Sequence, residues 1–329
     1  MRVFVTGATG FVGSHLIRKL ASSKHDLCCL VRETSVTAQL EELGTSLVRG
    51  DVTRKGTLAR GMAGCDCVIH LANVYSLWES DTSVYSRVNI DGTRNVTEAA
   101  LDLGVPKVIH VSTVLVYGKP DQSPFSEETP PGPVQFSEYA RTKAEGDRIA
   151  WQLHETRGLP LVVLYPCGIL GPGDEKVTGQ VIRNLVSGKM PATVLDKSVF
   201  TYVHVRDVAE GIVKAMEREG NTGEKYFLGN LQLSMREFYE IVCECSGARM
   251  PRFKMPDPLA MPTARLLTLV ANIVKRPPLW GMSTDAIRMT LAGHRVDGTK
   301  AERELGITYT PLRQALEECV QSLDGQLRS

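Results

Sequence analysis

The sequence predicts an α/β fold: a doubly wound parallel sheet, followed by a smaller and mostly helical C-terminal part. Short apolar runs alternate with helix-like segments up to about Pro172, with short connections between them. This alternation is typical of a parallel sheet covered by helices on both faces. Beyond Pro172 the chain continues as helices and short strands without it. We therefore expect residues 1–165 to form one domain and residues 166–329 a second, with residues 199–222 returning to the first.

The bulk composition indicates a soluble globular protein. Apolar residues make up 43% of the 329 residues and charged residues 23%, both ordinary values. Lys and Arg total 38 against 37 Asp and Glu, so no basic field points to nucleic acid. The eight cysteines form no C-x-x-C pair, and we expect neither a disulfide framework nor a metal site. The chain shows no leader and no apolar run of membrane-spanning length, which predicts a cytoplasmic protein.

A glycine-rich turn follows the first predicted strand, Arg2 to Val5, and opens a helix that runs to about Leu20. Gly7, Gly10 and Gly13 give the spacing G-x-x-G-x-x-G. Such glycines permit a tight turn, close approach of the backbone to a pyrophosphate, and packing of helix on strand. The helix N-terminus offers free N–H donors to phosphate. A turn of purely structural use is the alternative, but the context predicts a dinucleotide site.

The run from Val5 to Gly13, VTGATGFVG, resembles the extended branch of the short-chain dehydrogenase/reductase superfamily, also described as the NAD-dependent epimerase/dehydratase family. The resemblance covers nearly the whole chain. It implies a Rossmann fold for residues 1–165 and a substrate-binding role for residues 166–329. The residues that it implies at the cofactor are Gly7, Thr9, Gly10, Phe11, Val12, Gly13, Arg32, Asp51, Val52, Leu71, Ala72, Asn73, Val111, Tyr139, Lys143, Pro166, Gly168 and Ile169.

The second predicted strand, Leu27 to Val31, ends at Arg32. An enzyme selective for NAD typically places a carboxylate at this point, whereas an arginine accommodates a 2′-phosphate. We therefore expect NADP(H) as cofactor, with NAD(H) possible. A solvated arginine just past a strand end is the alternative.

The third and fourth predicted strands, residues 46–49 and 67–71, lead to the adenosine end of the expected site. By the resemblance, Asp51 lies at the adenine ring and can accept from its exocyclic amine. His70 closes the fourth strand, and we interpret it as a satisfied core histidine rather than a catalyst. A long helix is expected from Asp81 to Leu103, and the loop before it carries Trp78 toward the substrate.

The predicted chemistry centres on one tyrosine and one lysine in a helix that begins at Ser137. Tyr139 and Lys143 are four residues apart, so they share one helix face. The unperturbed pKa of a tyrosine is about 10, and a neighbouring ammonium would favour the phenolate. Thr113, after the fifth predicted strand, supplies a hydroxyl for the same substrate oxygen. We expect Thr113, Tyr139 and Lys143 to be catalytic, with Tyr117 four residues after Thr113 supporting Thr113 rather than Ser112 as the matched hydroxyl.

Departures from the family patterns narrow the expected reaction. Dehydratases that resemble this chain carry Asp-Glu after the catalytic threonine, whereas Leu115 belongs to a Val-Leu pair here. Nucleotide-sugar epimerases usually place an arginine where this chain has Phe200, and phenylalanine cannot bind a diphosphate. Later segments resemble dihydroflavonol-reductase-type proteins, which implies an apolar carbonyl or alcohol as substrate. We expect Trp78, Leu115, Tyr117 and Cys167 near it.

The sequence is compatible with two other hypotheses about the function. One is a nucleotide-sugar epimerase or reductase that holds its substrate differently; another is a catalytically idle NADP(H)-binding protein.

The protein is expected to be a monomer or a homodimer, with a small molecule as its partner. Residues 120–133 are expected to form an exposed loop. The apolar helix within residues 256–278 is expected to close the substrate pocket, with contact to a membrane as the alternative.

Overall fold

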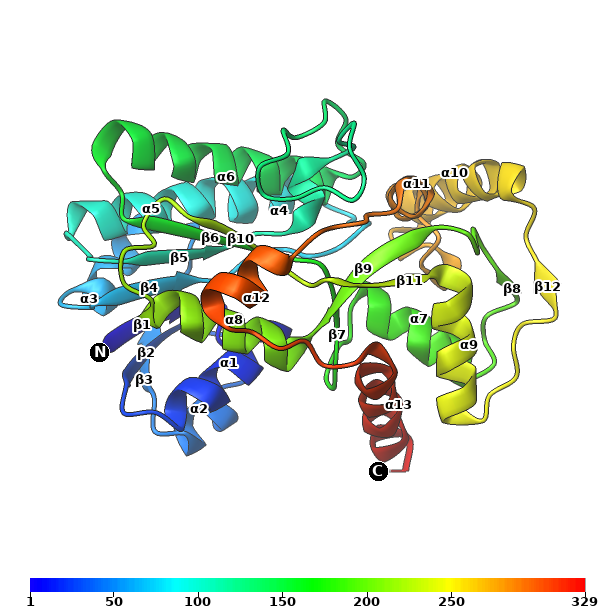
Figure 1. Ribbon diagram of the computed structural model, residues 1–329, viewed down its shortest axis with the longest axis horizontal. Helices are drawn as coiled ribbons and strands as arrows, with labels where there is room; N and C mark the ends of the chain where they lie inside the picture. The colour runs from blue at the N-terminus through cyan, green and yellow to red at the C-terminus, as the bar shows by residue number, and fades with distance from the viewer. Residues whose placement is uncertain (329) are drawn as a thin grey trace.

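The computed structural model describes residues 1–328. Its main element is a seven-stranded sheet in the order β10-β6-β5-β4-β1-β2-β3, in which every neighbouring pair is parallel (Figure 1). These strands are β1 (Arg2–Thr6), β2 (Asp26–Val31), β3 (Ser46–Arg49), β4 (Cys67–His70), β5 (Val108–Val111), β6 (Leu161–Pro166) and β10 (Lys225–Leu228). The predicted doubly wound α/β fold is confirmed.

Helices cover both faces of this sheet. Figure 1 shows α5 and α6 above it and α1 with α8 below it, and α1 packs directly on α8. The helices of this part are α1 (Phe11–Ala21), α2 (Ala38–Glu42), η1 (Lys55–Thr57), α3 (Ala59–Met62), α4 (Ser83–Tyr85), η2 (Ser86–Asp91), α5 (Gly92–Asp102), η3 (Val114–Tyr117), α6 (Glu138–Arg157), α8 (Val205–Glu217) and α12 (Thr299–Leu305).

The rest of the chain forms two small sheets and further helices around a second core. Its strands are β7 (Gly168–Leu170), β8 (Ala192–Thr193), β9 (Val199–His204), β11 (Leu231–Ser234) and β12 (Phe253–Lys254), and its helices are α7 (Val177–Val186), α9 (Met235–Ser246), α10 (Asp257–Val274), η4 (Leu279–Gly281), α11 (Thr284–Ala292) and α13 (Leu312–Arg328). The segment 199–222 is divided between the parts: β9 joins β7 and β11, whereas α8 lies against α1 of the main sheet.

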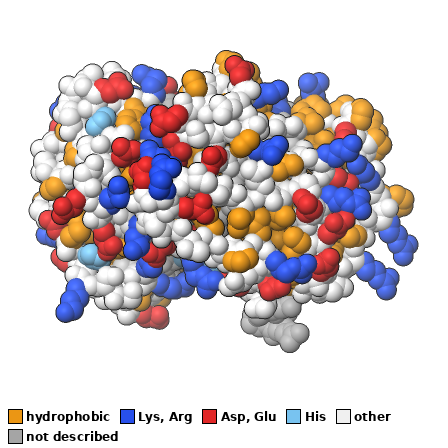
Figure 2. Space-filling model, in the orientation of Figure 1, with side chains coloured by type: hydrophobic (Ala, Val, Ile, Leu, Met, Phe, Trp, Pro, Cys, Tyr) orange, Lys and Arg blue, Asp and Glu red, His pale blue; other side chains and the backbone are white. Residues whose placement is uncertain are grey.

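Helix α10 packs through small residues and leaves its large ones outside. Ala260, Ala264 and Ala271 are buried, and the helix lies against α11. Several of its leucine, isoleucine and valine side chains are exposed. Figure 2 shows hydrophobic side chains on the surface at the end of the molecule where Figure 1 places α10. Among the helices within residues 1–328, none is both long enough and apolar enough to cross a bilayer.

The expected helix from Asp81 to Leu103 is present as α4, η2 and α5 in succession, with η2 in π-helical geometry. Asn89 lies in this π-helical segment. Its side chain accepts from the Val74 amide nitrogen at 2.8 Å and donates to the Thr142 hydroxyl at 3.1 Å. The segment therefore fixes the loop that follows β4 and joins it to helix α6.

The loop of residues 120–133 is irregular, as expected, but it is not exposed throughout. Phe125 is 2% exposed, and its backbone pairs with that of Arg295 and Asp297. Glu127 accepts a hydrogen bond from the backbone nitrogen of Phe227 at 2.7 Å. Phe227 lies in β10, the edge strand of the main sheet, where an unpaired N–H would otherwise be open. The proline-rich composition predicted exposure, but this segment covers a sheet edge.

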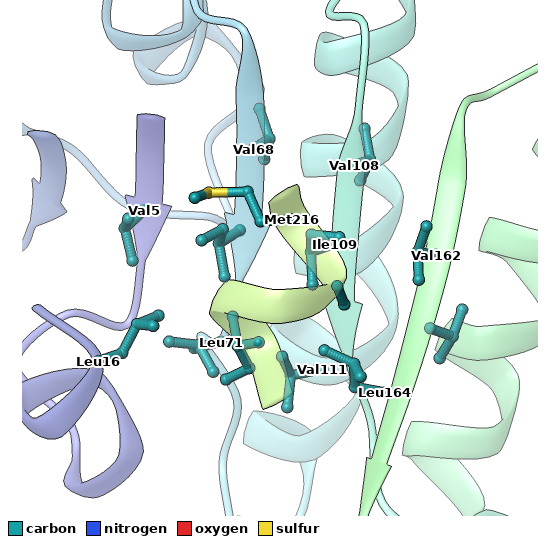
Figure 3. Packing of buried hydrophobic residues seen from close by; sticks show 14 of the residues in the cluster. Val5, Leu16, Val68, Leu71, Val108, Ile109, Val111, Val162, Leu164 and Met216 are labelled. Carbon is teal, nitrogen blue, oxygen red and sulfur yellow. The ribbon is translucent and has the colours of Figure 1, made fainter. Parts of the chain in front are cut away.

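The core of the main sheet consists of strand residues that are buried on both faces. In Figure 3, Val68, Ile109 and Val162 come from neighbouring strands; Met216 of α8 lies beside Val68 and Ile109, and Leu16 of α1 lies near Val5. This two-sided burial explains why the strands are continuous apolar runs rather than alternating ones.

The sheet order reverses at β1. The chain proceeds from β1 to β2 and β3 on one side, and β4, β5 and β6 lie on the other. In open α/β sheets a crevice forms beyond the carboxyl ends of the strands at such a point, and ligands bind there. The glycine turn after β1 and the segment Leu71–Asn73 after β4 both lie at this edge.

Candidate active site

A cavity of about 560 Å³ opens at the point where the strand order reverses and is lined by residues of both parts of the chain. Every residue expected at the cofactor lines it, except Lys143. These lining residues are Gly7, Thr9, Gly10, Phe11, Val12, Gly13, Arg32, Asp51, Val52, Leu71, Ala72, Asn73, Val111, Tyr139, Pro166, Gly168 and Ile169.

The glycine turn is packed too closely for larger residues. Gly7 has a φ of +75°, and a Cβ there would lie 2.7 Å from the Ala72 nitrogen. A Cβ on Gly13 would overlap the Gly7 carbonyl oxygen. Gly10 caps α1 without a side-chain hydrogen bond, and the first turn of α1 holds no acidic residue. Its N–H groups can therefore receive an anion such as a pyrophosphate.

Arg32 and Asp51 lie at the ends of β2 and β3. Arg32 is exposed, and its backbone nitrogen donates to the Ser35 hydroxyl at 3.1 Å. Ser35 also lines the cavity, and nothing in the sequence indicated it. Asp51 uses one carboxylate oxygen, Oδ1, to accept from both the nitrogen and the hydroxyl of Thr53 at 2.8 Å. Its other oxygen has no such partner within residues 1–323.

Thr113 and Tyr139 lie on the cavity wall beside one another. Thr113 follows β5, and its hydroxyl oxygen accepts from the Leu115 nitrogen at 3.3 Å, which leaves its hydrogen free to donate. Tyr139 lies in the first turn of α6, where Ser137 caps the helix by accepting from the Ala140 nitrogen. The Tyr139 ring is 5% exposed and packs on Tyr75, with the ring centres 4.9 Å apart.

The surroundings of Tyr139 keep its phenol protonated. Burial raises the pKa of Tyr139 well above its usual value, and Tyr75 and Asp147 raise it further. A hydrogen bond from Thr113 acts in the opposite direction and lowers this pKa, as a donor to a phenolate does. The phenol can therefore serve as a proton donor whose anion Thr113 stabilises.

Lys143 lies one turn further along α6, behind the cavity wall. It is 2% exposed, and its ammonium group donates to the Val111 carbonyl oxygen at 3.0 Å. Burial lowers the pKa of Lys143 to about 8, and Asp147 acts in the opposite direction. The ammonium contacts a backbone carbonyl oxygen in this structure, and the expected effect of Lys143 on the phenol stays a prediction.

Two neighbouring polar residues have other partners. The Ser112 hydroxyl donates to Asp147 at 2.9 Å, so its hydrogen is directed away from Tyr139, toward which Thr113 is directed. His70 is 1% exposed, and its ring nitrogens lie 2.8 Å from the Thr6 hydroxyl and 3.2 Å from that of Thr93. The interpretation of His70 as a satisfied core histidine is confirmed.

The expected substrate residues divide into two pairs. Leu115 and Cys167 line the cavity. Trp78 does not, because its indole nitrogen donates to Asn272 of α10 at 2.8 Å. Tyr117 is 3% exposed, and its hydroxyl donates to the Glu127 carbonyl oxygen. Tyr117 lies in the core because the 3-10 helix η3 turns its side chain under the loop of residues 120–133.

Residues from β7 onward make up most of the remaining wall, and apart from Phe200 the sequence did not indicate them individually. They come from β9, α7, α9, α11 and the segment that follows α11, and include Val177, Val181, Phe200, Tyr202, Met235, Phe238, Met289, Thr290 and His294. Helix α10 contributes no residue to the lining. The expectation that α10 closes the pocket was wrong, because its apolar side chains point outward.

His294 is the most unusual of these residues. It is 4% exposed, and its ring lies near Phe136 and Phe200, with ring centres 5.8 and 6.2 Å away. Neither ring nitrogen has a hydrogen-bond partner of acceptable geometry within residues 1–323. Burial lowers the pKa of His294 to about 4, although the nearby Gly118 carbonyl raises it slightly. At neutral pH the imidazole is uncharged and can both donate and accept.

Comparison with known proteins places the chain in a family. A family model described as the NAD dependent epimerase/dehydratase family matches residues 3–229. The chain belongs to this family. The match includes the glycine turn, Thr113, Tyr139 and Lys143.

Relatives of this family cover nearly the whole chain. A protein of Synechocystis sp. that carries the name dihydroflavonol 4-reductase is 30% identical over 96% of this chain and 93% of its own length. A 4-hydroxy-2-methyl-3-oxo-4-farnesyl-3,4-dihydroquinoline-1-oxide ketoreductase of Stigmatella aurantiaca is 31% identical over 93% of this chain and 91% of its own.

Solved structures agree with the family. The crystal structure of gox2253 is 33% identical, covers 99% of this chain and 98% of its own, and has a TM-score of 0.84. DesIV, a dTDP-glucose 4,6-dehydratase from Streptomyces venezuelae with NAD and DAU bound, is 29% identical over 98% and 97% of the two chains, with a TM-score of 0.79. The family thus includes both reductases and dehydratases, and its fold is the extended Rossmann fold described above.

Proposed function

We propose that the chain is an NADP(H)-dependent oxidoreductase that interconverts a carbonyl and an alcohol in a largely apolar small molecule. The observation that carries this proposal is the position of Tyr139 and Thr113 side by side on one cavity wall, with the glycine turn on the same cavity. One group can protonate a substrate oxygen, a second can stabilise the resulting charge, and a dinucleotide can lie within reach of both.

The residues present fit a dinucleotide. Gly7 and Gly13 have no room for a side chain, so the backbone of the turn is open to a pyrophosphate at the N-terminus of α1. Asp51 retains one carboxylate oxygen for an adenine amine. By the family resemblance Lys143 is the group for the nicotinamide ribose; its ammonium lies behind the wall, at the carbonyl oxygen of the lining residue Val111.

Arg32 and Ser35 support the choice of NADP(H). Both line the cavity at the end of β2, where a ribose 2′-substituent is expected. A guanidinium and a hydroxyl are donors that suit a phosphate. No carboxylate among the described lining residues at the end of β2 would repel it, since Asp51, which lies after β3, is turned toward Thr53.

The proton chemistry follows from the pKa of the phenol. When bound, the nicotinamide supplies or accepts the hydride. In the reducing direction Tyr139 donates its proton to the substrate oxygen, because burial keeps the phenol protonated at neutral pH. Thr113 donates a hydrogen bond to the same oxygen or to the phenolate that remains. In the oxidising direction the step is reversed: the Tyr139 phenolate accepts the alcohol proton, and the hydrogen bond from Thr113 stabilises that phenolate beforehand.

The lining indicates an apolar substrate. Beyond Tyr139 the wall is formed largely by aromatic and aliphatic residues, among them Phe200, Tyr202, Met235 and Phe238. Phe200 stands where an epimerase would carry a diphosphate-binding arginine. The relatives described above include a ketoreductase whose named substrate carries a farnesyl chain, which supports this substrate class.

A nucleotide-sugar reaction is the second candidate, and Lys176 is the observation that favours it. Lys176 is exposed at the cavity lining and could meet a substrate phosphate. Addition of a nucleotide sugar in heavy water separates the two candidates. A dehydratase would release water and take up solvent deuterium at a sugar carbon, and an epimerase would convert the sugar into a stereoisomer, whereas the proposed reductase leaves the sugar unchanged.

The proposal is tested by following NADPH oxidation with aliphatic, aromatic, flavonoid and steroid carbonyls. We expect turnover with at least one class, and we expect Tyr139→Phe to lower kcat about 10²- to 10⁴-fold while NADPH still binds. NADPH binding without turnover across all classes would indicate an idle cofactor-binding protein. Equal rates in both proteins would remove Tyr139 from the mechanism.

A further inference from the structure

The outward face of α10 is more hydrophobic than its buried face. On the buried face lie alanines, whereas the outward face carries large aliphatic side chains. The residues of this face, hereafter the α10 face, are Leu259 (54% exposed), Leu266 (61%), Leu269 (57%), Val270 (46%), Ile273 (72%) and Val274 (53%). Their spacing of three, four and seven residues places them on one side of the helix.

The ends of α10 extend this surface. Leu279 and Trp280 lie in η4, separated from the last residue of α10 by four residues, and are 61% and 45% exposed. A contiguous apolar patch of this kind on a soluble protein marks an interaction site. Because α10 contributes nothing to the cavity, the α10 face has no function in the site described above.

The segment of the chain that contains α10 is basic. Between residues 249 and 276 there are six Lys and Arg residues and a single acidic one, Asp257, a formal charge of +5, whereas the whole chain carries +1. All six basic residues are exposed; they are Arg249, Arg252, Lys254, Arg265, Lys275 and Arg276. Within residues 1–323 only Lys254 among them forms an ion pair, with Asp196. Figure 2 shows basic and hydrophobic side chains side by side at this end of the molecule.

We propose that the α10 face docks on the surface of an anionic lipid bilayer. A helix with an aliphatic face, flanking cations and a tryptophan at its end matches the boundary between acyl chains and anionic headgroups. The basic residues would be attracted by the negative surface potential. The helix would lie in the interface rather than span the bilayer.

The charge argues against a second copy of the chain as the occupant. A symmetric dimer through the α10 face would bring two segments of +5 together, and like charges in one interface are unfavourable. The α10 face is also convex, being the surface of one helix, whereas another protein would have to offer a groove for it. A lipid surface needs no matching shape.

Docking would bring the wall of the cavity close to the lipid. Helix α10 packs on α11, which contributes Met289 and Thr290 to the cavity. Asn272 of α10 also holds Trp78, in the same loop as the cavity residue Tyr75. An apolar substrate could then pass between bilayer and cavity. This consequence rests on the proposed function, whereas the docking itself does not.

The test is co-sedimentation of the purified full chain with vesicles, without cofactor or substrate. We use phosphatidylcholine vesicles with and without phosphatidylglycerol. We expect binding to the anionic vesicles, weaker binding to the neutral ones, and a decrease as salt concentration rises. Trp280 emission should shift to shorter wavelength on binding. Absence of binding to both kinds of vesicle would overturn the proposal, whatever the enzymatic result.

Two double variants locate the contact. Leu266→Ser with Ile273→Ser should lower the partition coefficient about tenfold or more, since two aliphatic side chains no longer leave water. Lys275→Gln with Arg276→Gln should reduce binding to anionic vesicles and leave binding to neutral ones unchanged. The matched controls are Leu103→Ser, an exposed leucine after α5, and Arg148→Gln, an exposed arginine of α6.

Unchanged vesicle binding in the serine variant would show that another surface is responsible and would overturn the assignment. All the substituted side chains are exposed, so the variants should fold, and their thermal unfolding is measured to check this. Light scattering gives the molecular mass in solution. A dimer that the serine substitutions dissociate, together with no vesicle binding, would assign the α10 face to a second copy and reject the lipid surface. Stoichiometric binding to an added protein partner instead of vesicles would reject it in the same way.

Discussion

Some residues at this cavity have the positions that the sequence predicted, and others do not. Tyr139 and Thr113 are adjacent on the wall and engage one another, as their order in the sequence suggested. Lys143 has the expected position on the helix, yet its ammonium faces a backbone carbonyl instead of the phenol. His294 was not indicated at all, because a single histidine after a glycine carries no pattern. Each of these residues gives a separate prediction.

Arg32→Ala should change the choice of cofactor. Hydrogen bonds to charged groups contribute about 1.5–3 kcal/mol, so the affinity for NADPH should fall by about 10- to 100-fold while that for NADH changes little. Dissociation constants from fluorescence titration measure both. Arg157→Ala, which removes an exposed arginine paired with Asp102, is the control. An unchanged ratio of the two affinities would assign the 2′-phosphate to other residues.

Lys143→Met should lower activity without lowering the free energy of unfolding at pH 7. The folded pKa of about 8 lies below the usual value of 10.5, so the folded state releases this proton first. The free energy of unfolding of the wild type should therefore rise between pH 8 and pH 10.5. Below pH 8 this lysine should make no pH-dependent contribution to it. The variant lacks this rise, and at pH 7 it should be at least as stable as the wild type, since a buried charge is gone.

Urea unfolding at several pH values measures this difference, because other titrating groups are common to both proteins. Turnover of the variant should fall about 10- to 100-fold if the ammonium holds a ribose hydroxyl. The same dependence of unfolding free energy on pH in both proteins would contradict the assignment of this proton to Lys143.

His294→Phe should affect only substrates with a second polar group. The neutral imidazole has no hydrogen-bond partner within residues 1–323, so a substrate hydroxyl or carbonyl can supply one. A neutral hydrogen bond contributes about 0.5–1.5 kcal/mol, which corresponds to about a three- to tenfold rise in KM. His294→Gln should retain part of the affinity. The comparison uses hydroxylated and deoxy forms of one carbonyl; an equal effect on both would limit His294 to packing.

Among the elements of the fold, the turn between β1 and α1 should tolerate substitution least. Gly13→Ala would place a methyl group against the Gly7 carbonyl oxygen and force α1 away from the turn. We expect unfolding free energy to fall by about 1–3 kcal/mol or more, with a larger loss in cofactor affinity. Gly56→Ala is the matched control, because nothing lies within 4 Å of a Cβ there. Similar losses in both variants would contradict the role of the turn.

Elements of the main sheet could be predicted from the sequence because their signals are local. A run such as β3 is apolar between polar ends, and its bounds of Ser46–Arg49 agree with those expected. The loop of residues 120–133 and helix α10 could not be placed in the same way. Composition shows that a segment is polar or apolar, but what covers it depends on tertiary contacts, as with Phe125 under the sheet edge. For α10, hydrophobicity predicted burial, whereas its alanines are the residues that pack.

Across the whole molecule, the cavity residues that we assign to the cofactor could be predicted from the sequence, whereas most of those that we assign to the substrate could not. The former lie in segments at the ends of consecutive parallel strands, which topology brings together. The latter come from β9, α7, α9 and α11, whose arrangement has no local signature. Trp78 and Tyr117 were misplaced for this reason: adjacency in sequence to the site did not mean adjacency in space.

In the proposed reaction a hydride passes from the nicotinamide to the substrate carbonyl in this cavity, and Tyr139 donates the proton. A single turnover with NADPH that carries deuterium at both C4 positions tests it directly, with mass spectrometry of the product of the best carbonyl. We expect the product to carry deuterium on the former carbonyl carbon. The Tyr139→Phe variant should form this product about 10²- to 10⁴-fold more slowly than the wild type. Product without deuterium, or equal rates of its formation in the two proteins, would contradict it.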